Sequence, residues 1–169
     1  NGQALQYASE KLKDNKEVVM LAVKQSGMSL QYVSNKMKRD KDVVLAAINQ
    51  NSYALLDAGY ELQNNKEVVL TAVRKNGWAL QFASKALRSD HDVLKAAIKQ
   101  KATSLRFAPK ELRSDRSFII SMVSINGMAL EFASDQLKKD KAVVKTAMKQ
   151  NKQALKFADQ SLQQQLKGT

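Results

Sequence analysis

The sequence contains no cysteine, one proline, one histidine and six glycines among its 169 residues. Without cysteine, disulfides, thiolate metal sites and a cysteine nucleophile are excluded. The scarcity of proline and glycine argues against a β-sandwich or β-barrel, which needs many turns. No stretch approaches the roughly 18 consecutive apolar residues of a membrane span, and the first residues lack the basic and apolar segments of a signal peptide. A hydrophobic content of 44% with 26% charged residues indicates a globular chain.

The chain does contain an internal repeat of 25 residues, without insertion or deletion. The same spacing recurs in several columns, of which the clearest is Leu5, Leu30, Leu55, Leu80, Leu105, Leu130 and Leu155. We therefore predict one repeat domain over 1–169, with units of approximately 1–25, 26–50, 51–75, 76–100, 101–125, 126–150 and 151–169. Since residue 1 falls inside a copy and is not methionine, we expect a fragment of a longer protein or a processed form.

Each copy has two apolar stripes with helical spacing. In the fourth copy they predict a helix A near 79–88 and a helix B near 91–100. Asp or Asn precedes each helix B where an N-cap belongs, at Asn15, Asp40, Asn65, Asp90, Asp115 and Asp140. Gly27, Gly77 and Gly127 follow helix B, where C-cap glycines are common. From the second copy on, these glycines alternate with Ser52, Ala102 and Lys152, which indicates a functional unit of 50 residues.

Stripes of about ten residues are too short to be stable as isolated helices, so they must pack against neighbouring copies. The predicted fold class is all-α, an α-solenoid of short two-helix 25-residue repeats with about 13–14 helices. Small residues at the start of helix A, such as Ala54 and Ala79, would let neighbouring helices approach closely. The pattern leaves the hand of the solenoid open.

Segments of the third and fourth copies carry a family resemblance. The stretches Asn65-Lys66-Glu67-Val68-Val69-Leu70-Thr71-Ala72-Val73 and Asn76-Gly77-Trp78-Ala79-Leu80-Gln81-Phe82-Ala83-Ser84 resemble the family called domain of unknown function 4116. The resemblance covers nearly the whole chain. It implies a repeat architecture, and it associates the chain with bacterial, viral and unicellular-eukaryote proteins, including effectors secreted by intracellular bacterial pathogens. It implies no activity and no catalytic residues.

An enzyme would have little chemistry to use in this sequence. His91, the only histidine, stands where most sister copies have lysine, and we interpret it as a surface residue at a helix start. No metal-binding His-Glu-x-x-His motif, nucleophile elbow or phosphate-binding loop is present. The aspartates recur in every copy as caps, whereas an active site is seldom repeated along a chain. We expect no catalysis, no metal and no cofactor; an enzyme with its catalytic domain outside the fragment is a weaker hypothesis.

The net charge of +12 is concentrated in columns. A basic column at the end of helix A and another at the start of helix B lie three residues apart and predict a basic ridge, formed by Lys13, Lys16, Lys38, Arg39, Lys41, Lys66, Arg88, Arg113, Arg116, Lys138 and Lys141. Cations at a helix C-terminus complement the dipole, but a lysine at the first helical position opposes it. Such a ridge could bind nucleic-acid phosphates or an anionic surface nonspecifically, in a salt-dependent manner.

A second column has large apolar residues at the start of helix A: Met28, Tyr53, Trp78 and Met128. Two interpretations stay open, namely packing between copies and an exposed contact stripe for a partner. Tyr60 stands where sister copies have Glu10, Asn35, Lys85 and Lys110, so we expect it to be exposed and assign it to the same candidate stripe. The third copy is therefore the first place to look for a specific protein contact.

From these observations we expect a non-enzymatic scaffold for protein–protein interaction, with a protein partner of unknown identity. The alternative is a polyanion-binding module that acts through the basic ridge. Against specific nucleic-acid recognition, no column mixes Asn, Gln, Arg and aromatic residues as modular RNA readers do. The sequence does not indicate a compartment or an oligomeric state.

Overall fold

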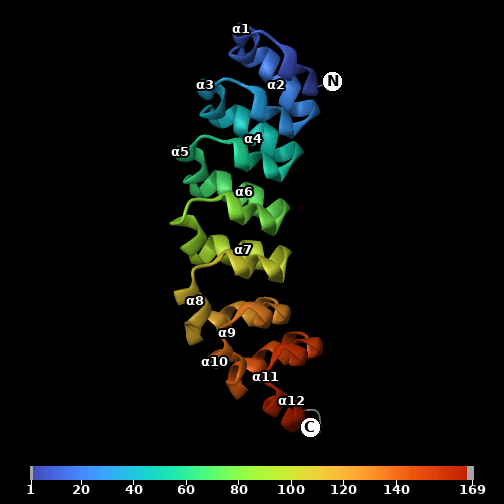
Figure 1. The fold of residues 1–169 in the computed structure, drawn as a ribbon, viewed down its shortest axis with the longest axis vertical. Coiled ribbons are helices and arrows are strands. Elements are labelled where there is room, and N and C mark those ends of the chain that lie inside the picture. The colour runs from blue at the N-terminus through green and yellow to red at the C-terminus, as the bar shows by residue number, and fades with distance from the viewer. Residues whose placement is uncertain (1, 167–169) are drawn as a thin grey trace. The chain divides into compact units, whose positions relative to one another are not determined.

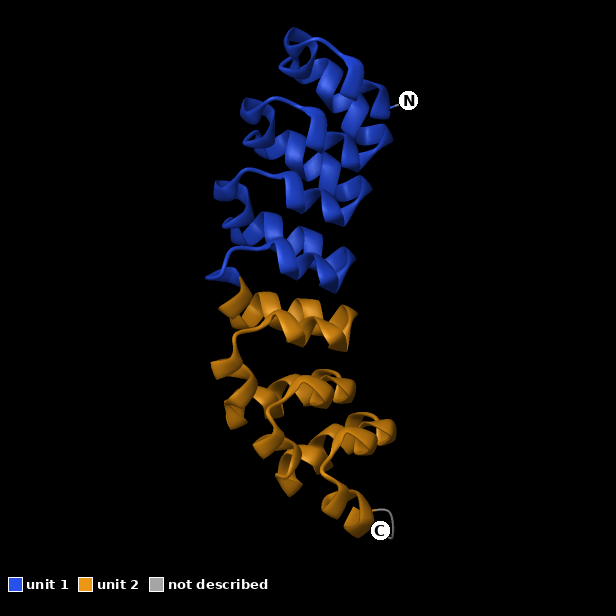
Figure 2. Cartoon of the chain, in the orientation of Figure 1, with its two compact units in different colours: residues 1–87 blue, residues 88–169 orange. Residues whose placement is uncertain are grey.

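The chain is an all-α solenoid in the computed structural model, which describes residues 2–166 (Figure 1). It divides into two compact units, Asn1–Leu87 and Arg88–Thr169 (Figure 2). No strand occurs between residues 2 and 166. Both units are built from copies of the same plan, so the predicted fold class is confirmed.

The longest segment of each complete copy is a ten-residue α-helix. These helices are α2 (Lys16–Gln25), α4 (Lys41–Gln50), α6 (Lys66–Lys75), α7 (His91–Gln100), α9 (Arg116–Ile125) and α11 (Lys141–Gln150). The prediction for helix B is thereby confirmed to the residue in the fourth copy. The predicted caps are confirmed as well: the Asn15 side chain accepts from the Val18 N–H, and the Asp40 side chain accepts from the N–H groups of Asp42 and Val43.

The predicted helix A, near 79–88, is not one continuous helix. Each copy instead begins with a six-residue 3-10 helix: η1 (Gly2–Tyr7), η2 (Gly27–Tyr32), η3 (Ser52–Asp57), η4 (Gly77–Phe82), η6 (Ala102–Phe107), η7 (Gly127–Phe132) and η8 (Lys152–Phe157). A short helix follows: α1 (Glu10–Lys13), α3 (Asn35–Lys38), α5 (Tyr60–Gln63), the 3-10 helix η5 (Leu87–Ser89), α8 (Lys110–Ser114), α10 (Asp135–Lys138) and α12 (Gln160–Leu166). Residues 2–166 thus hold 20 helical segments instead of 13–14.

The break in helix A has a cause in the backbone. In the second copy, two residues separate the 3-10 helix from the short helix, and both have extended backbone. They are Val33, with φ −78° and ψ 164°, and Ser34, with φ −61° and ψ 157°. The second of these residues donates its N–H to a carbonyl group in the last turn of the preceding copy's short helix. This bond recurs as Ser34 to Lys13 at 3.0 Å, Gly59 to Lys38 at 2.7 Å, Ser84 to Gln63 at 3.0 Å, Ser134 to Arg113 at 2.9 Å and Asp159 to Lys138 at 3.0 Å.

The break therefore converts an intrahelical hydrogen bond into one between copies. A serine at this place also restarts the helix, because the hydroxyls of Ser9 and Ser34 accept from the N–H groups of Leu12 and Met37. The sequence carries a signal for the break, since the column reads Ser9, Ser34, Gly59, Ser84, Pro109, Ser134 and Asp159. These residue types are typical of helix starts and turns, not of a helix interior.

The core of each unit lies between successive copies. In unit 1, α4 packs against both α2 and α6, and in unit 2, α9 packs against both α7 and α11. The leucine column of the 3-10 helices is inserted between them, and Leu30, Leu55, Leu80, Leu105 and Leu130 are fully buried. At about 1.5–3 kcal/mol for a fully buried aliphatic side chain, this column contributes strongly to the stacking of the copies.

The glycines do not cap helices in the predicted way. No glycine among residues 2–166 has positive φ, and the residues that end α2, α6 and α9 are Ser26, Asn76 and Asn126, all with extended backbone. Glycine is needed for a different reason. A Cβ on Gly27 would clash with the carbonyl oxygen of Ala47 in the next copy, and one on Gly127 would clash with that of Ala147. The requirement is a close approach between neighbouring copies.

A glutamine accompanies this glycine. The Gly27 N–H donates to Gln50 Oε1 at 2.6 Å, and the Gly127 N–H donates to Gln150 Oε1 at 2.6 Å. In the sequence, glutamine ends helix B 23 residues after Gly2, Gly27, Gly77 and Gly127, whereas Ser52 and Ala102 are followed at that distance by Lys75 and Ile125. Glycine and glutamine therefore occur together, and from the second copy on they alternate with junctions that have neither residue.

We predict that Gly27→Ala destabilises the chain by about 1–3 kcal/mol, the usual cost of forcing an extra group into a packed site. Urea unfolding followed by circular dichroism measures the change. The control is Ala102→Gly at the equivalent place in the fifth copy, where we expect only the modest backbone-entropy cost of glycine, below about 1 kcal/mol. Equal stability of Gly27→Ala and the wild type would contradict the close-approach argument.

Candidate interaction surfaces

The first column of the predicted basic ridge lies at the ends of the short helices. Lys13, Lys38, Arg113 and Lys138 are half-buried, as is Arg88 in η5. Lys13 pairs with Glu10 at 3.0 Å and Lys138 with Asp135 at 3.6 Å, both within their own helix. Arg113 Nη1 donates to the carbonyl oxygen of Phe132 at 3.4 Å. These cations contact their own scaffold and present only part of their charge to solvent.

The second column of the ridge forms ion pairs between copies. Lys16 Nζ lies 2.8 Å from Asp40 and 3.0 Å from Asp42, which are the cap and first-turn acids of the next copy. Lys41 pairs in the same way with Glu67 at 2.6 Å, and Arg116 pairs with Asp140 at 2.7 Å. A cation at the first helical position is unfavourable within its own helix, but here it forms an ion pair with an acid of the next copy.

These pairs shift the proton affinities of their members. The hydrogen bonds that the Lys16 ammonium donates to Asp40 and Asp42 raise the pKa of Lys16. The Arg116 guanidinium and then the Val143 N–H lower the pKa of Asp140. For Asp40, burial acts to raise the pKa, but hydrogen bonds from Lys16 and Val43 outweigh burial and the net pKa is lowered. The ladder is therefore most stable with every member charged.

The other predicted ridge residues are less uniform. Arg39 approaches Glu61 at 3.8 Å, and Lys66 and Lys141 are exposed at the starts of α6 and α11. His91 occupies the ladder position in α7, but its ring packs on Phe118 of the next copy, with centroids 4.9 Å apart. At that junction Ser117 stands where the first four copies have an acid, and His91 makes an aromatic contact.

The predicted apolar column is only partly exposed. Met28, Tyr53, Trp78 and Met128 are all half-buried. The side chains of Asn51, Asn76 and Asn126 accept hydrogen bonds from the backbone N–H groups of Tyr53, Trp78 and Met128, and the Tyr53 ring meets Phe82 edge-on at 5.7 Å. The column therefore contributes to packing and also retains some accessible surface.

The third copy departs most from its sisters. Tyr60 is 69% exposed, in agreement with the expectation, and Leu56 is 52% exposed. Leu56 is the only apolar residue in its column, whose other members are Gln6, Gln31, Gln81, Arg106, Glu131 and Lys156, so the sequence carries a signal for this exposed leucine. Asp57 lies between them in sequence and replaces the Tyr or Phe of every other copy.

Asp57 has an unusual environment for a carboxylate. Burial raises its pKa, against the opposing charge of Lys38. Its Oδ2 atom is buried without a hydrogen-bond partner. The site thus combines two exposed apolar side chains with one acceptor whose hydrogen-bonding capacity is unused. We call Leu56, Asp57 and Tyr60 the third-copy patch.

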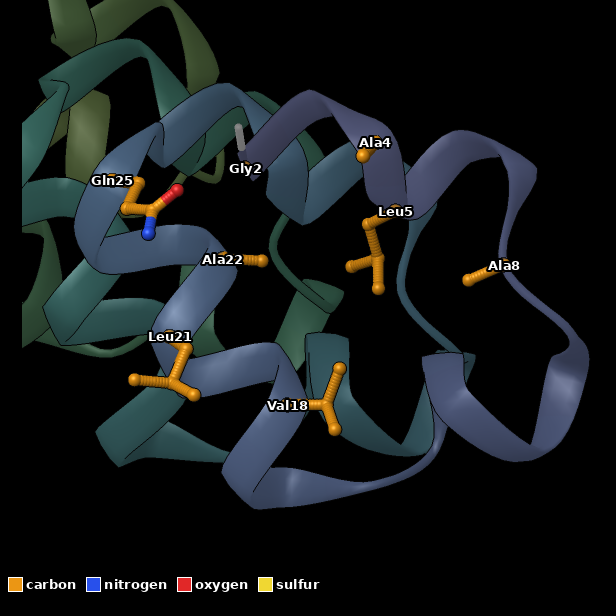
Figure 3. Close-up of a pocket in the computed structure, with 8 residues that line it drawn as sticks. All are labelled: Gly2, Ala4, Leu5, Ala8, Val18, Leu21, Ala22 and Gln25. Carbon is orange, nitrogen blue, oxygen red and sulfur yellow. The ribbon is translucent and has the colours of Figure 1, made fainter.

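An apolar hollow of about 310 Å³ lies in the first copy, between η1 and α2 (Figure 3). Ala4 and Leu21 line it and are exposed, and Val18 is half-buried. In inner copies the residues equivalent to Val18 and Ala4, such as Val43 and Ala54, are fully buried against a preceding copy. The hollow therefore corresponds to the surface on which one copy stacks against another, and its shape is that of the repeat junction.

The repeats match a known family. The model of a family described as Domain of unknown function (DUF4116) matches residues 1–38, 15–63, 40–88, 65–113 and 115–163, which together cover almost the whole chain. The chain belongs to this family. The third and fourth matches each begin 25 residues, or one copy, after the match before, and each spans about two copies. The DUF4116 model thus covers two successive copies at a time.

No curated protein matches the chain, and no solved structure matches it. In the described part of this DUF4116 chain, no group of three or more His, Asp and Glu side chains is placed to hold a metal ion. Nor does any helix between residues 2 and 166 have the length and apolar character needed to cross a bilayer.

The inter-copy ladder leads to a pH prediction. Because the native pKa values of Asp40 and Asp140 are lowered, their contribution to stability is complete above the ordinary carboxyl pKa of about 3.9 and is lost as the pH falls through the lower native values. We expect the thermal midpoint to fall as the pH is lowered from about 5 towards 2. Asp140→Asn should keep the cap, as Asn15 and Asn65 do, but lower the midpoint at pH 7 and flatten its pH dependence.

The control for the ladder is Asp135→Asn, which removes a carboxylate that is 96% exposed and pairs only within its own short helix. We expect its midpoint to stay close to that of the wild type at pH 7. If Asp135→Asn and Asp140→Asn gave the same curve, the inter-copy ion pair would contribute nothing specific.

Proposed function

We propose that the chain is a non-enzymatic scaffold that binds a protein partner through the third-copy patch. The observation that supports this most directly is the exposure of Leu56 and Tyr60 at positions where the other copies have polar residues. Because the same fold forms in copies with Gln or Lys at these positions, stacking does not require an exposed leucine and tyrosine. Tyrosine and other apolar anchors are enriched in protein interfaces.

The surroundings of the patch define the chemistry of the partner. Glu61 lies beside Tyr60 in α5 and is exposed. A partner segment with an apolar side chain for the surface of Leu56 and Tyr60, and a lysine or arginine for Glu61, would complement both features.

The alternative function, polyanion binding along the basic ridge, has less support. Lys16, Lys41 and Arg116 are committed to acids of the next copy, and Lys13 and Lys138 to acids of their own helices. A phosphate would have to displace these carboxylates. The ridge is therefore a structural ladder first, and its free charge is smaller than the sequence indicates.

A peptide-display selection tests the patch. The wild-type chain is the bait, and the double variant Leu56→Gln, Tyr60→Lys, which installs the residues of sister copies, is the counter-selection target. We expect enriched peptides to contain an apolar anchor and a basic residue. Full burial of one such anchor is worth about 1.5–3 kcal/mol, so we expect these peptides to bind the double variant at least tenfold more weakly.

The matched control is Tyr7→Asp, Leu21→Thr, which removes two exposed apolar side chains from the first copy and installs the residues found at Asp57 and at Thr71 or Thr146. Peptides that bind the patch should bind this control as tightly as the wild type. Equal binding to all three proteins, or a selection without enrichment, would refute the proposal.

A further inference from the structure

Four exposed cations without ion pairs lie outside the predicted ridge, on the ten-residue helices of unit 2. Lys95 and Lys99 of α7, and Lys145 and Lys149 of α11, are exposed. None of the four lies within ion-pair distance of an acid among residues 2–166. We call these four residues the lysine face.

The fold does not require these lysines. The positions of Lys95 and Lys145 are occupied by Met20, Leu45, Leu70 and Ile120 in the other complete copies, all half-buried aliphatic side chains. A lysine in such a place covers the same surface with its stem and adds a charge. Both substitutions occur in unit 2, in the fourth and sixth copies.

The net charge is also more positive in unit 2 than in unit 1. Unit 2 carries 16 of the 28 lysines and arginines but only 8 of the 16 acids, which makes its net charge +8, against +4 for unit 1. The outer face repeats this difference. Within α7, α9 and α11, Asp92 is the only acidic residue. In unit 1, α2, α4 and α6 each have one acid, at Glu17, Asp42 and Glu67.

The lysine face consists of two pairs of lysines. Each helix presents two lysines four residues apart, on the same side and about 6 Å from each other. The helix α9 packs between α7 and α11 and has Ile120 and Ser124 at the equivalent positions. With helices about 8–10 Å apart, the two lysine pairs are separated by about 16–20 Å. The long stems of lysine can adapt this span to the two phosphate strands that border a major groove about 12 Å wide.

We infer that the lysine face binds the phosphate backbone of double-stranded nucleic acid without sequence preference, independently of the third-copy patch. All four cations are lysines, which contact phosphate as point charges and so read no sequence. No large apolar side chain is exposed among the described residues of unit 2. The face therefore has no anchor for insertion into a membrane and no aromatic platform for unpaired bases. A partner held by charge alone needs a dense and regular array of charge, which a duplex provides.

Fluorescence anisotropy with a labelled 20-base-pair duplex of mixed sequence tests this inference. The face variant replaces Lys95, Lys99, Lys145 and Lys149 by Gln. The control replaces Lys11, Lys24, Arg74 and Lys75 of unit 1 by Gln, so that both variants have the same net charge. These four control residues are exposed and make no ion pair among residues 2–166. Thermal melts confirm that both variants remain folded.

We expect the face variant to bind at least tenfold more weakly than the control in 50 mM KCl. Four phosphate contacts at about 0.9 each should also make the slope of log K against log salt shallower by roughly 3.6 in the face variant, while the control keeps most of the wild-type slope. Two different duplex sequences should bind equally well. Equal losses in both variants would show that only net charge matters and would overturn the assignment to this face.

Two further probes separate other polyanions from nucleic acid. Binding of poly-glutamate and of vesicles that contain phosphatidylserine is measured for the wild type, the face variant and the control. Weaker binding to both than to the duplex, at equal salt, is the expected result. Face-dependent binding to poly-glutamate or to vesicles that matches or exceeds duplex binding would overturn nucleic acid as the partner.

Discussion

The stacking of one copy on the next is the constraint on which the rest of this structure depends. No helix in the described part of the chain is long enough to be stable alone, so each must bury its apolar face against a neighbour. Two interactions fix the geometry of that contact. One is the leucine column of the 3-10 helices, inserted between ten-residue helices. The other is the backbone hydrogen bond from residues such as Ser34 to the preceding copy, here to Lys13. The first supplies the free energy and the second fixes the register.

Polar interactions between copies are adapted to this register. The Lys16 ammonium reaches the cap acid of the next helix because the translation between copies places Asp40 within 2.8 Å. The same translation brings the Gly27 N–H to Gln50. At the junction of His91, the first-turn acid is replaced by Ser117 and the ring of His91 packs on Phe118. Much of the charge that the sequence displays is thus structural, and a functional surface has to be sought where the repeat departs from its own consensus.

Two such departures stand out, and they differ in chemistry. In the third copy, Leu56 and Tyr60 place apolar surface where other copies are polar. In unit 2, Lys95 and Lys145 place charge where other copies are aliphatic. Each departure keeps the backbone plan intact, because these positions lie on surfaces that stacking leaves accessible. A DUF4116 array can therefore vary its binding properties copy by copy without a change of fold, as is typical of repeat proteins.

The sequence by itself determined the 25-residue period, the all-α solenoid, the ten-residue helices with their Asn and Asp caps, and the exposure of Tyr60. These follow from local signals and from the burial of apolar stripes, which are legible residue by residue. Only the tertiary structure decided that helix A breaks at Val33 and Ser34 and at the equivalent residues of other copies. It also decided that Gly27 permits a close approach and does not cap a helix, and that ridge cations such as Lys16 and Arg116 form ion pairs with the next copy. The physical reason is that each of these depends on an atom of the adjacent copy, roughly one repeat away along the chain, whose distance is set by packing and by nothing in the local pattern.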